Sequence, residues 1–157
     1  MALVGWLAVY PVLGIASIFW QAVLNWISQL NSQLATPPQQ AVETLSHTTN
    51  PGQLLFMAVS FVILAPINEE LFFRAGLYRF CKSRVPARYA TIAVSLLFAA
   101  AHANLLMFFP LFVLGLLLTR LYERTGHIAV PMLVHALFNL TTMALILLFP
   151  DSSGALH

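Results

Sequence analysis

The sequence predicts an all-α fold: a polytopic transmembrane helical bundle of about five spans, surrounded by membrane lipid. Hydrophobic residues make up 60% of the 157 residues and charged residues only 8%, whereas a soluble domain carries about 25% charged residues. The apolar residues gather in stretches that approach the roughly 20 residues needed to cross a bilayer. The length predicts one domain, so we expect residues 1–157 to form a single integral membrane domain.

The first expected span covers residues 3–27. Residues 1–19 contain no Lys or Arg, and the apolar stretch is longer than the hydrophobic region of a secretory signal, so we interpret it as a retained transmembrane helix. The second expected span covers residues 53–80 and is long and polar in its middle. It follows Asn50-Pro51-Gly52, a sequence that predicts a turn.

Three further spans are expected over residues 88–103, 105–122 and 128–149. The first of these is short for a bilayer crossing. Together with the second span they make up a motif-bearing core, residues 53–149. Aromatic residues that favour the membrane interface lie near the span ends: Trp6, Tyr10, Trp20, Trp26 and Tyr122.

The distribution of cations predicts the orientation of the chain. Every Lys and Arg except Arg74 falls in or beside the loop after the second span or the loop after the fourth. These two loops lie on one side of the membrane, and residues 31–52 and the tail after residue 149 contain no Lys or Arg. The positive-inside rule therefore places the N-terminus in the cytoplasm and the C-terminus outside.

Charge balance and cysteine content argue against several classes of function. The sequence contains seven Lys and Arg and five Asp and Glu, and it has no basic stripe interleaved with aromatic residues. No nucleic-acid partner is therefore expected. The single cysteine, Cys81, excludes an internal disulfide framework and a metal site built from several cysteines.

Six of the polar residues within the expected spans carry groups suited to acid–base or hydrogen-bond chemistry. A charged group at the centre of a transmembrane helix costs about 2.5 to 3.5 kcal/mol on insertion scales, so a chain that carries several must pair or use them. Counting about 1.5 Å per residue from the cytoplasmic loops, three helices bring these groups to similar depth. The six residues are Glu69, Glu70, Arg74, His102, His135 and Asn139.

Helical geometry divides the two glutamates. Glu70 and Arg74 are four residues apart on one helical face and can pair, whereas Glu69 points about 100° away. Glu69 is therefore the free carboxylate and a candidate general base, with His102 on another helix as its expected neighbour.

His135 and Asn139 are also four residues apart, so we expect imidazole and carboxamide to project toward one point. Such a pair would suit the oxyanion of a tetrahedral intermediate. Phe98 lies one turn before His102 and is expected to pack against its imidazole or to line the site.

These residues fall in three motifs that resemble those of a known family. Glu69-Glu70-Leu71-Phe72-Phe73-Arg74 resembles the E-E-x-x-x-R motif of the CAAX prenyl protease type II and bacteriocin-processing (CPBP, or Abi) family. Phe98 to His102 resembles its F-x-x-x-H motif, and His135 to Asn139 its H-x-x-x-N motif. The resemblance implies an intramembrane endopeptidase. In that family pattern Glu69 and His102 activate water, His135 and Asn139 stabilise the oxyanion, and Glu70 and Arg74 hold the site together.

The same residues leave a metal-dependent alternative open. Glu69, His102 and His135 would supply two imidazoles and one carboxylate with an open position, a set that zinc accepts. However, no H-E-x-x-H segment supplies two ligands and a separate base, and Glu70 is assigned to Arg74. We favour water activation by Glu69 and His102 and keep a divalent metal, zinc, as the alternative.

Other functions and the substrate also stay open at this point. The polar residues suit a noncatalytic membrane scaffold or bacteriocin self-immunity factor, and less well a small ion or proton transporter, because the chain shows no inverted repeat. The resemblance implies a membrane-associated or prenylated peptide substrate and a site opening toward the cytoplasm from the bacterial inner (cell) membrane. Prenyl proteases of the family carry more helices before the motifs, so this chain is either a near-minimal core or lacks part of its N-terminus.

Overall fold

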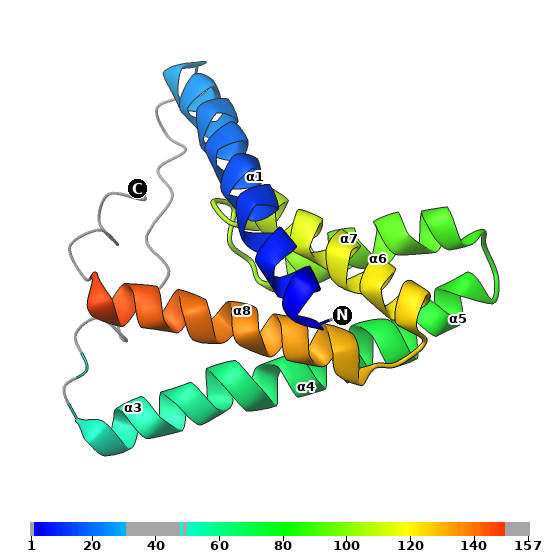
Figure 1. Ribbon diagram of the computed structural model, residues 1–157. Helices are drawn as coiled ribbons and strands as arrows, with labels where there is room; N and C mark the ends of the chain where they lie inside the picture. The colour runs from blue at the N-terminus through cyan, green and yellow to red at the C-terminus, as the bar shows by residue number, and fades with distance from the viewer. Residues whose placement is uncertain (1, 31–47, 49, 150–157) are drawn as a thin grey trace.

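The computed structural model describes residues 2–30, 48 and 50–149. These residues form five helical rods, with no strand among them, so the all-α prediction is confirmed. The first rod is α1 (Ala2–Leu30), and the second is a continuous rod of five segments, α3 (Pro51–Ala58), η1 (Val59–Leu64), α4 (Ala65–Glu70), η2 (Leu71–Tyr78) and α5 (Arg79–Lys82). The remaining rods are α6 (Ala87–Ala101), α7 (Phe108–Thr125) and α8 (Ala129–Leu148) (Figure 1).

Local sequence explains several helix ends. The Oδ1 atom of Asn50 accepts hydrogen bonds from the backbone N–H groups of Gly52 and Gln53, at 2.9 and 3.3 Å, and Pro51 occupies the first helical turn. The predicted turn is therefore not found: Asn50 caps the helix, and Pro51 and Gly52 already belong to α3. At its other end, α7 stops at Gly126, whose φ of 68° is accessible to glycine at little cost.

The rod over residues 51–82 is not a regular α-helix. Segments η1 and η2 are π-helical. Between them lies the short α-helix α4, which carries Glu69 and Glu70. Pro66 lies at the start of α4 and has no backbone N–H to donate. The N–H of Ala65 donates to the carbonyl of Ser60, five residues earlier, which is the hydrogen bond of a π-helix.

Three of the rods are long and apolar enough to cross a membrane: Val9–Gln29 within α1, Pro51–Lys82, and Ala129–Leu148. The expected spans over residues 88–103 and 105–122 correspond to α6, which is shorter, and to α7, which carries Arg120, Glu123 and Arg124 in its last two turns. The count of five spans and the orientation stay predictions. The predicted orientation depends in part on the 31–52 connection and on the tail after residue 149. Most of that connection and all of that tail lie outside the described residues.

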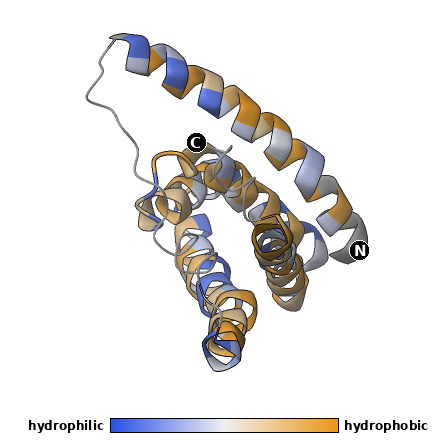
Figure 2. Cartoon of the chain, turned by 90° about the vertical axis from the view of Figure 1, so that its left-hand side faces the viewer, coloured by the Kyte–Doolittle hydropathy of each residue, from blue (hydrophilic) through white to orange (hydrophobic). Residues whose placement is uncertain are grey.

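The exterior of the rods is apolar. Large hydrophobic side chains such as Ile18, Phe56, Phe72 and Leu148 are more than half exposed, and hydrophobic residues recur along every helix, with hydrophilic residues among them (Figure 2). Such a surface is suited to lipid and not to water.

The rods pack around a core to which α6, α7, α8 and η2 all contribute. Helices α6 and α7 pack closely at Gly115, where an added Cβ would lie 3.0 Å from the Cβ of Ser95. Helix α8 runs beside the 51–82 rod, and α1 crosses α7 and α8 (Figure 1). The Tyr10 hydroxyl of α1 donates to the Phe138 carbonyl of α8 at 3.1 Å. Fully buried core side chains include Tyr78, Val94, Phe98, Leu114, Leu118 and Val134.

Candidate active site

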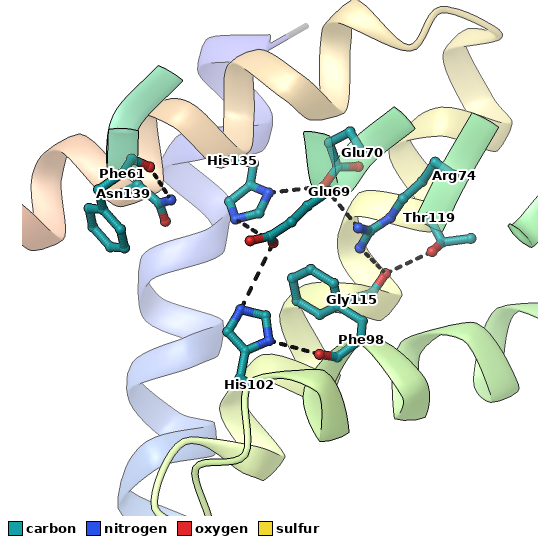
Figure 3. Close-up of polar contacts among 10 residues, drawn as sticks. All are labelled: Phe61, Glu69, Glu70, Arg74, Phe98, His102, Gly115, Thr119, His135 and Asn139. Carbon is teal, nitrogen blue, oxygen red and sulfur yellow. Dashed lines mark hydrogen bonds and ion pairs between the residues drawn. The ribbon is translucent and has the colours of Figure 1, made fainter. Parts of the chain in front are cut away.

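Three rods bring the motif residues to one place inside the bundle (Figure 3). Glu69 and Glu70 end α4, and Arg74 follows on η2. His102 is the residue that caps the C-terminus of α6, and His135 lies on α8. Residues that are 33 to 66 positions apart in the chain are therefore neighbours in space, as the sequence predicts.

A buried ion pair forms the floor of the site. The Nη1 of Arg74 donates to the Oε1 of Glu70 at 2.8 Å, and both side chains are 0% exposed, so the predicted pairing is confirmed. The guanidinium also lies 4.6 Å from the centre of the Phe98 ring, within cation–π range. A buried charge needs such partners because water is excluded from it.

His135 joins this pair to the free glutamate. Its Nδ1 lies 2.9 Å from the Oε1 of Glu70, the atom that also accepts from Arg74. Because a carboxylate can only accept, Nδ1 carries the hydrogen and Nε2 is turned to the other side of the ring. The Nε2 atom lies 3.8 Å from the Oε2 of Glu69. Glu70 therefore fixes the orientation of His135 toward Glu69.

His102 faces the same carboxylate from α6. Its Nδ1 donates to the Phe98 carbonyl at 2.8 Å, which leaves Nε2 directed at the Oε2 of Glu69, 3.9 Å away. The Phe98 ring packs on the imidazole with centroids 4.9 Å apart, as expected. Ala103, the next residue, has φ of 48°, a left-handed conformation that costs a non-glycine residue about 1 to 2 kcal/mol. This strained turn ends α6 directly after the histidine.

Glu69 is the point at which these contacts meet. Its Oε2 has no hydrogen-bond partner among the described groups, because 3.8 and 3.9 Å are too long for direct hydrogen bonds to the two imidazoles. Its side chain is 28% exposed and that of His102 is 25% exposed, whereas Glu70 and Arg74 are fully buried. Glu69 and His102 are thus the accessible members of the cluster, and the residues behind them support it.

Asn139 differs from expectation. It lies one turn after His135 on α8, but its amide nitrogen donates to the backbone carbonyl of Phe61 in η1 at 2.8 Å. One of its two N–H groups is therefore held by the backbone of the neighbouring rod and does not point with His135 toward a common centre. The helical spacing was predicted correctly, but the partner of the amide was not.

Two backbone carbonyls of the site could not be identified from the sequence. The Gly115 carbonyl accepts from the Arg74 Nη2 at 3.4 Å and from the Thr119 hydroxyl at 2.8 Å. The Phe98 carbonyl holds His102. Every residue has a carbonyl, so no residue type identifies these positions in a sequence.

The spacing of the cluster bears on the zinc alternative. A tetrahedral zinc with bonds near 2.1 Å keeps its ligand atoms about 3.4 Å apart, whereas Glu69 Oε2 lies 3.8 Å from one imidazole nitrogen and 3.9 Å from the other. Within the residues that the structure describes, no group of three His, Cys, Asp or Glu side chains is arranged to hold a metal ion. As placed, Glu69, His102 and His135 do not fit the metal set considered from the sequence.

Comparison with known proteins gives one family match. The family model for the type II CAAX prenyl endopeptidase Rce1-like proteins matches residues 51–141. An Escherichia coli protein described as "Uncharacterized 24.3 kDa protein" is 29% identical over 154 residues, which cover 90% of this chain and 70% of that protein. The UPF0177 protein YaiH of Lactococcus lactis subsp. lactis (strain IL1403) is 31% identical over 97 residues, which cover 61% of this chain and 40% of that protein. No solved structure matches this chain.

Proposed function

Because this chain belongs to the type II CAAX prenyl endopeptidase Rce1-like family, we propose that it is an intramembrane endopeptidase that hydrolyses membrane-associated or prenylated peptides. The family consists of proteases, and the apolar helices make the chain an integral membrane protein. The observation that carries the proposal is the Glu69 carboxylate. Its Oε2 is a buried atom without a hydrogen-bond partner among the described groups and lies 3.8 to 3.9 Å from two imidazole nitrogens, while the side chain as a whole is 28% exposed.

In the proposed reaction, Glu69 and His102 activate the attacking water. A separation of 3.9 Å between the Glu69 Oε2 and the His102 Nε2 suits two groups bridged by one water and not bonded directly. The Phe98 carbonyl holds the hydrogen of His102 on Nδ1, so the neutral ring presents a lone pair at Nε2. Both groups then accept hydrogen bonds from the same water, which exposes its oxygen lone pair to the peptide carbonyl.

The proton balance of this reaction is simple. Glu69 takes a proton as the water oxygen adds to the carbonyl carbon, which gives a tetrahedral oxyanion. When the C–N bond breaks, that proton passes to the leaving nitrogen, and the products are an amine and a carboxylic acid that keeps the second proton of the water. The acid then gives this proton to the amine or to bulk water. Glu69 is a carboxylate again at the end of the turnover.

His135 and Asn139 are the proposed donors to the oxyanion. His135 donates from Nδ1 to Glu70, and its role as an oxyanion donor requires a hydrogen on Nε2 as well, which is directed toward the reacting centre. Asn139 has a second amide hydrogen beyond the one that the Phe61 carbonyl receives. Glu70 and Arg74 act as positioning residues, because they hold His135 and touch no reacting atom in this scheme.

We place the protein in the bacterial inner membrane, with the site opening toward the cytoplasm. The support is the charge distribution, since every Lys and Arg other than Arg74 lies on residues 79–88 or 120–124. A peptide anchored by a lipid on the cytoplasmic leaflet would reach Glu69 from that side.

The test compares membranes from cells that produce the wild-type protein, Glu69→Gln or Glu123→Gln. Glu69→Gln removes the base and keeps the shape, and Glu123→Gln is a matched control because Glu123 pairs with Lys82 outside the site. Sequencing of new peptide termini in membrane proteins should find termini that depend on Glu69 and persist in the control. Uncleaved clients should copurify with the Glu69→Gln protein.

The same termini in all three membranes would refute the protease proposal. A biological phenotype that survives Glu69→Gln would favour the noncatalytic scaffold or self-immunity factor, and Glu69-dependent ion flux in proteoliposomes would favour the transporter. Synthetic peptides that end in a CAAX sequence, with and without a prenyl group, then separate lipid-dependent cleavage from general peptide cleavage.

A further inference from the structure

The Phe61 carbonyl has lost its partner within the helix. In η1 the hydrogen bonds run from residue i+5 to residue i, as in the bond from the Ala65 N–H to the Ser60 carbonyl. The next donor in this register, for Phe61, would be residue 66. Residue 66 is a proline and has no N–H. The π-helical register and Pro66 together therefore free this one carbonyl.

The membrane makes such a free carbonyl costly. Phe61 is 41% exposed on the apolar exterior of the 51–82 rod, where lipid and not water would be its neighbour. In hydrocarbon an unpaired backbone carbonyl is costly, and a proline in a transmembrane helix is tolerated where a neighbouring helix, a side chain, a water or a local change of helical register satisfies the freed group. The amide of Asn139, on α8, donates to this carbonyl at 2.8 Å.

We infer that Pro66, the Phe61 carbonyl and Asn139 form one anchor that docks α8 onto the rod directly before Glu69. Pro66 creates the acceptor, and Asn139 occupies it. Pro66 thus acts on the site through a backbone atom of the preceding turn and not through a contact of its own side chain.

The anchor also bears on the proposed reaction, and this part rests on the proposed function. A planar carboxamide with one N–H held by Phe61 has its second N–H fixed in direction, because the two hydrogens share one plane. Pro66 is thus a positioning residue for the oxyanion donor Asn139. It touches no substrate itself.

The docking part is tested by a double-mutant cycle on stability, which needs no substrate. The variants are Asn139→Leu, Pro66→Ala and the double variant, each unfolded from mixed micelles by titration with SDS. With Pro66 present, Asn139→Leu leaves the carbonyl unpaired and should raise the unfolding equilibrium constant about tenfold or more. In the Pro66→Ala background the new N–H serves Phe61, so the same change should have a clearly smaller effect.

Thr141→Val is the matched control. The Thr141 hydroxyl donates its hydrogen bond to the Leu137 carbonyl within α8, at 2.9 Å, and not to the 51–82 rod. Its effect on stability should therefore be the same in the wild-type and Pro66→Ala backgrounds. An equal effect of Asn139→Leu in the two backgrounds would overturn the anchor, whether or not the protein is a protease.

The positioning part is tested on a cleaved client. Pro66→Ala should lower kcat with KM unchanged, because its N–H competes with Asn139 for the Phe61 carbonyl. The double variant should recover stability relative to Asn139→Leu but not cleavage. A wild-type kcat in Pro66→Ala, or recovery of cleavage in the double variant, would overturn the positioning role while leaving the Glu69 chemistry intact.

Discussion

Arg74→Met is the change that tests the buried ion pair most severely. Methionine keeps much of the apolar stem and removes the guanidinium, so Glu70 stays in the core without its partner. Both side chains are 0% exposed and their charged atoms are 2.8 Å apart. Breaking a buried pair on one side costs about 3 to 5 kcal/mol, and losing the cation over the Phe98 ring at 4.6 Å adds roughly 1 kcal/mol.

The assay is equilibrium unfolding in mixed micelles with SDS, followed by helical circular dichroism. Arg74→Met should lower the free energy of unfolding by about 4 to 6 kcal/mol. Glu70→Gln in the Arg74→Met background should recover part of that loss, because a neutral amide has no unpaired charge and its oxygen still accepts from His135. A loss under about 1 kcal/mol, or a double variant as unstable as Arg74→Met, would refute this account of the ion pair.

Three other predictions concern the helix contact, the strained turn and the metal. Gly115→Ala places a Cβ 3.0 to 3.2 Å from atoms of Ser95, including 3.1 Å from its backbone Cα. This variant should be less stable by about 1 to 3 kcal/mol in the same SDS titration. No change in stability would mean that α6 and α7 are farther apart. Ala103→Gly relieves φ of 48° and should leave stability unchanged or raise it by up to about 1 kcal/mol, whereas a clear loss would contradict the left-handed turn after His102. Cleavage by the purified protein should persist in excess chelator, because the Glu69 Oε2 lies farther from the His102 and His135 Nε2 atoms than the ligands of a tetrahedral zinc lie from one another. Activity that is lost to chelator and restored by zinc would support the metal alternative.

Contacts within one helix could be predicted from sequence. Glu70 and Arg74 pair because residues four apart share a helical face, and that rule needs no knowledge of neighbouring helices. The same argument leaves Glu69 free, and the apolar rods follow from composition and length. Depth counting from the basic loops was enough to bring His102 and His135 toward Glu69.

Contacts that depend on the backbone register could not be predicted. The π-helical segments on either side of α4 have no signature in residue type, so the free carbonyl of Phe61 and its bond to Asn139 could not be foreseen. Hydropathy also blurs the ends of short helices. Helix α6 stops at Ala101 because Ala103 turns left-handed, although the apolar stretch continues.

The central claim is that Glu69 and His102 act as one catalytic unit. The most direct measurement is a kinetic cycle on a client peptide in proteoliposomes, with wild-type protein, Glu69→Gln, His102→Ala and the double variant. Each single change should lower kcat/KM by at least about 100-fold, and the double variant should be no slower than the slower single variant, since residues that share one step are not additive. Losses that multiply, or a single variant that keeps the wild-type rate, would contradict the claim.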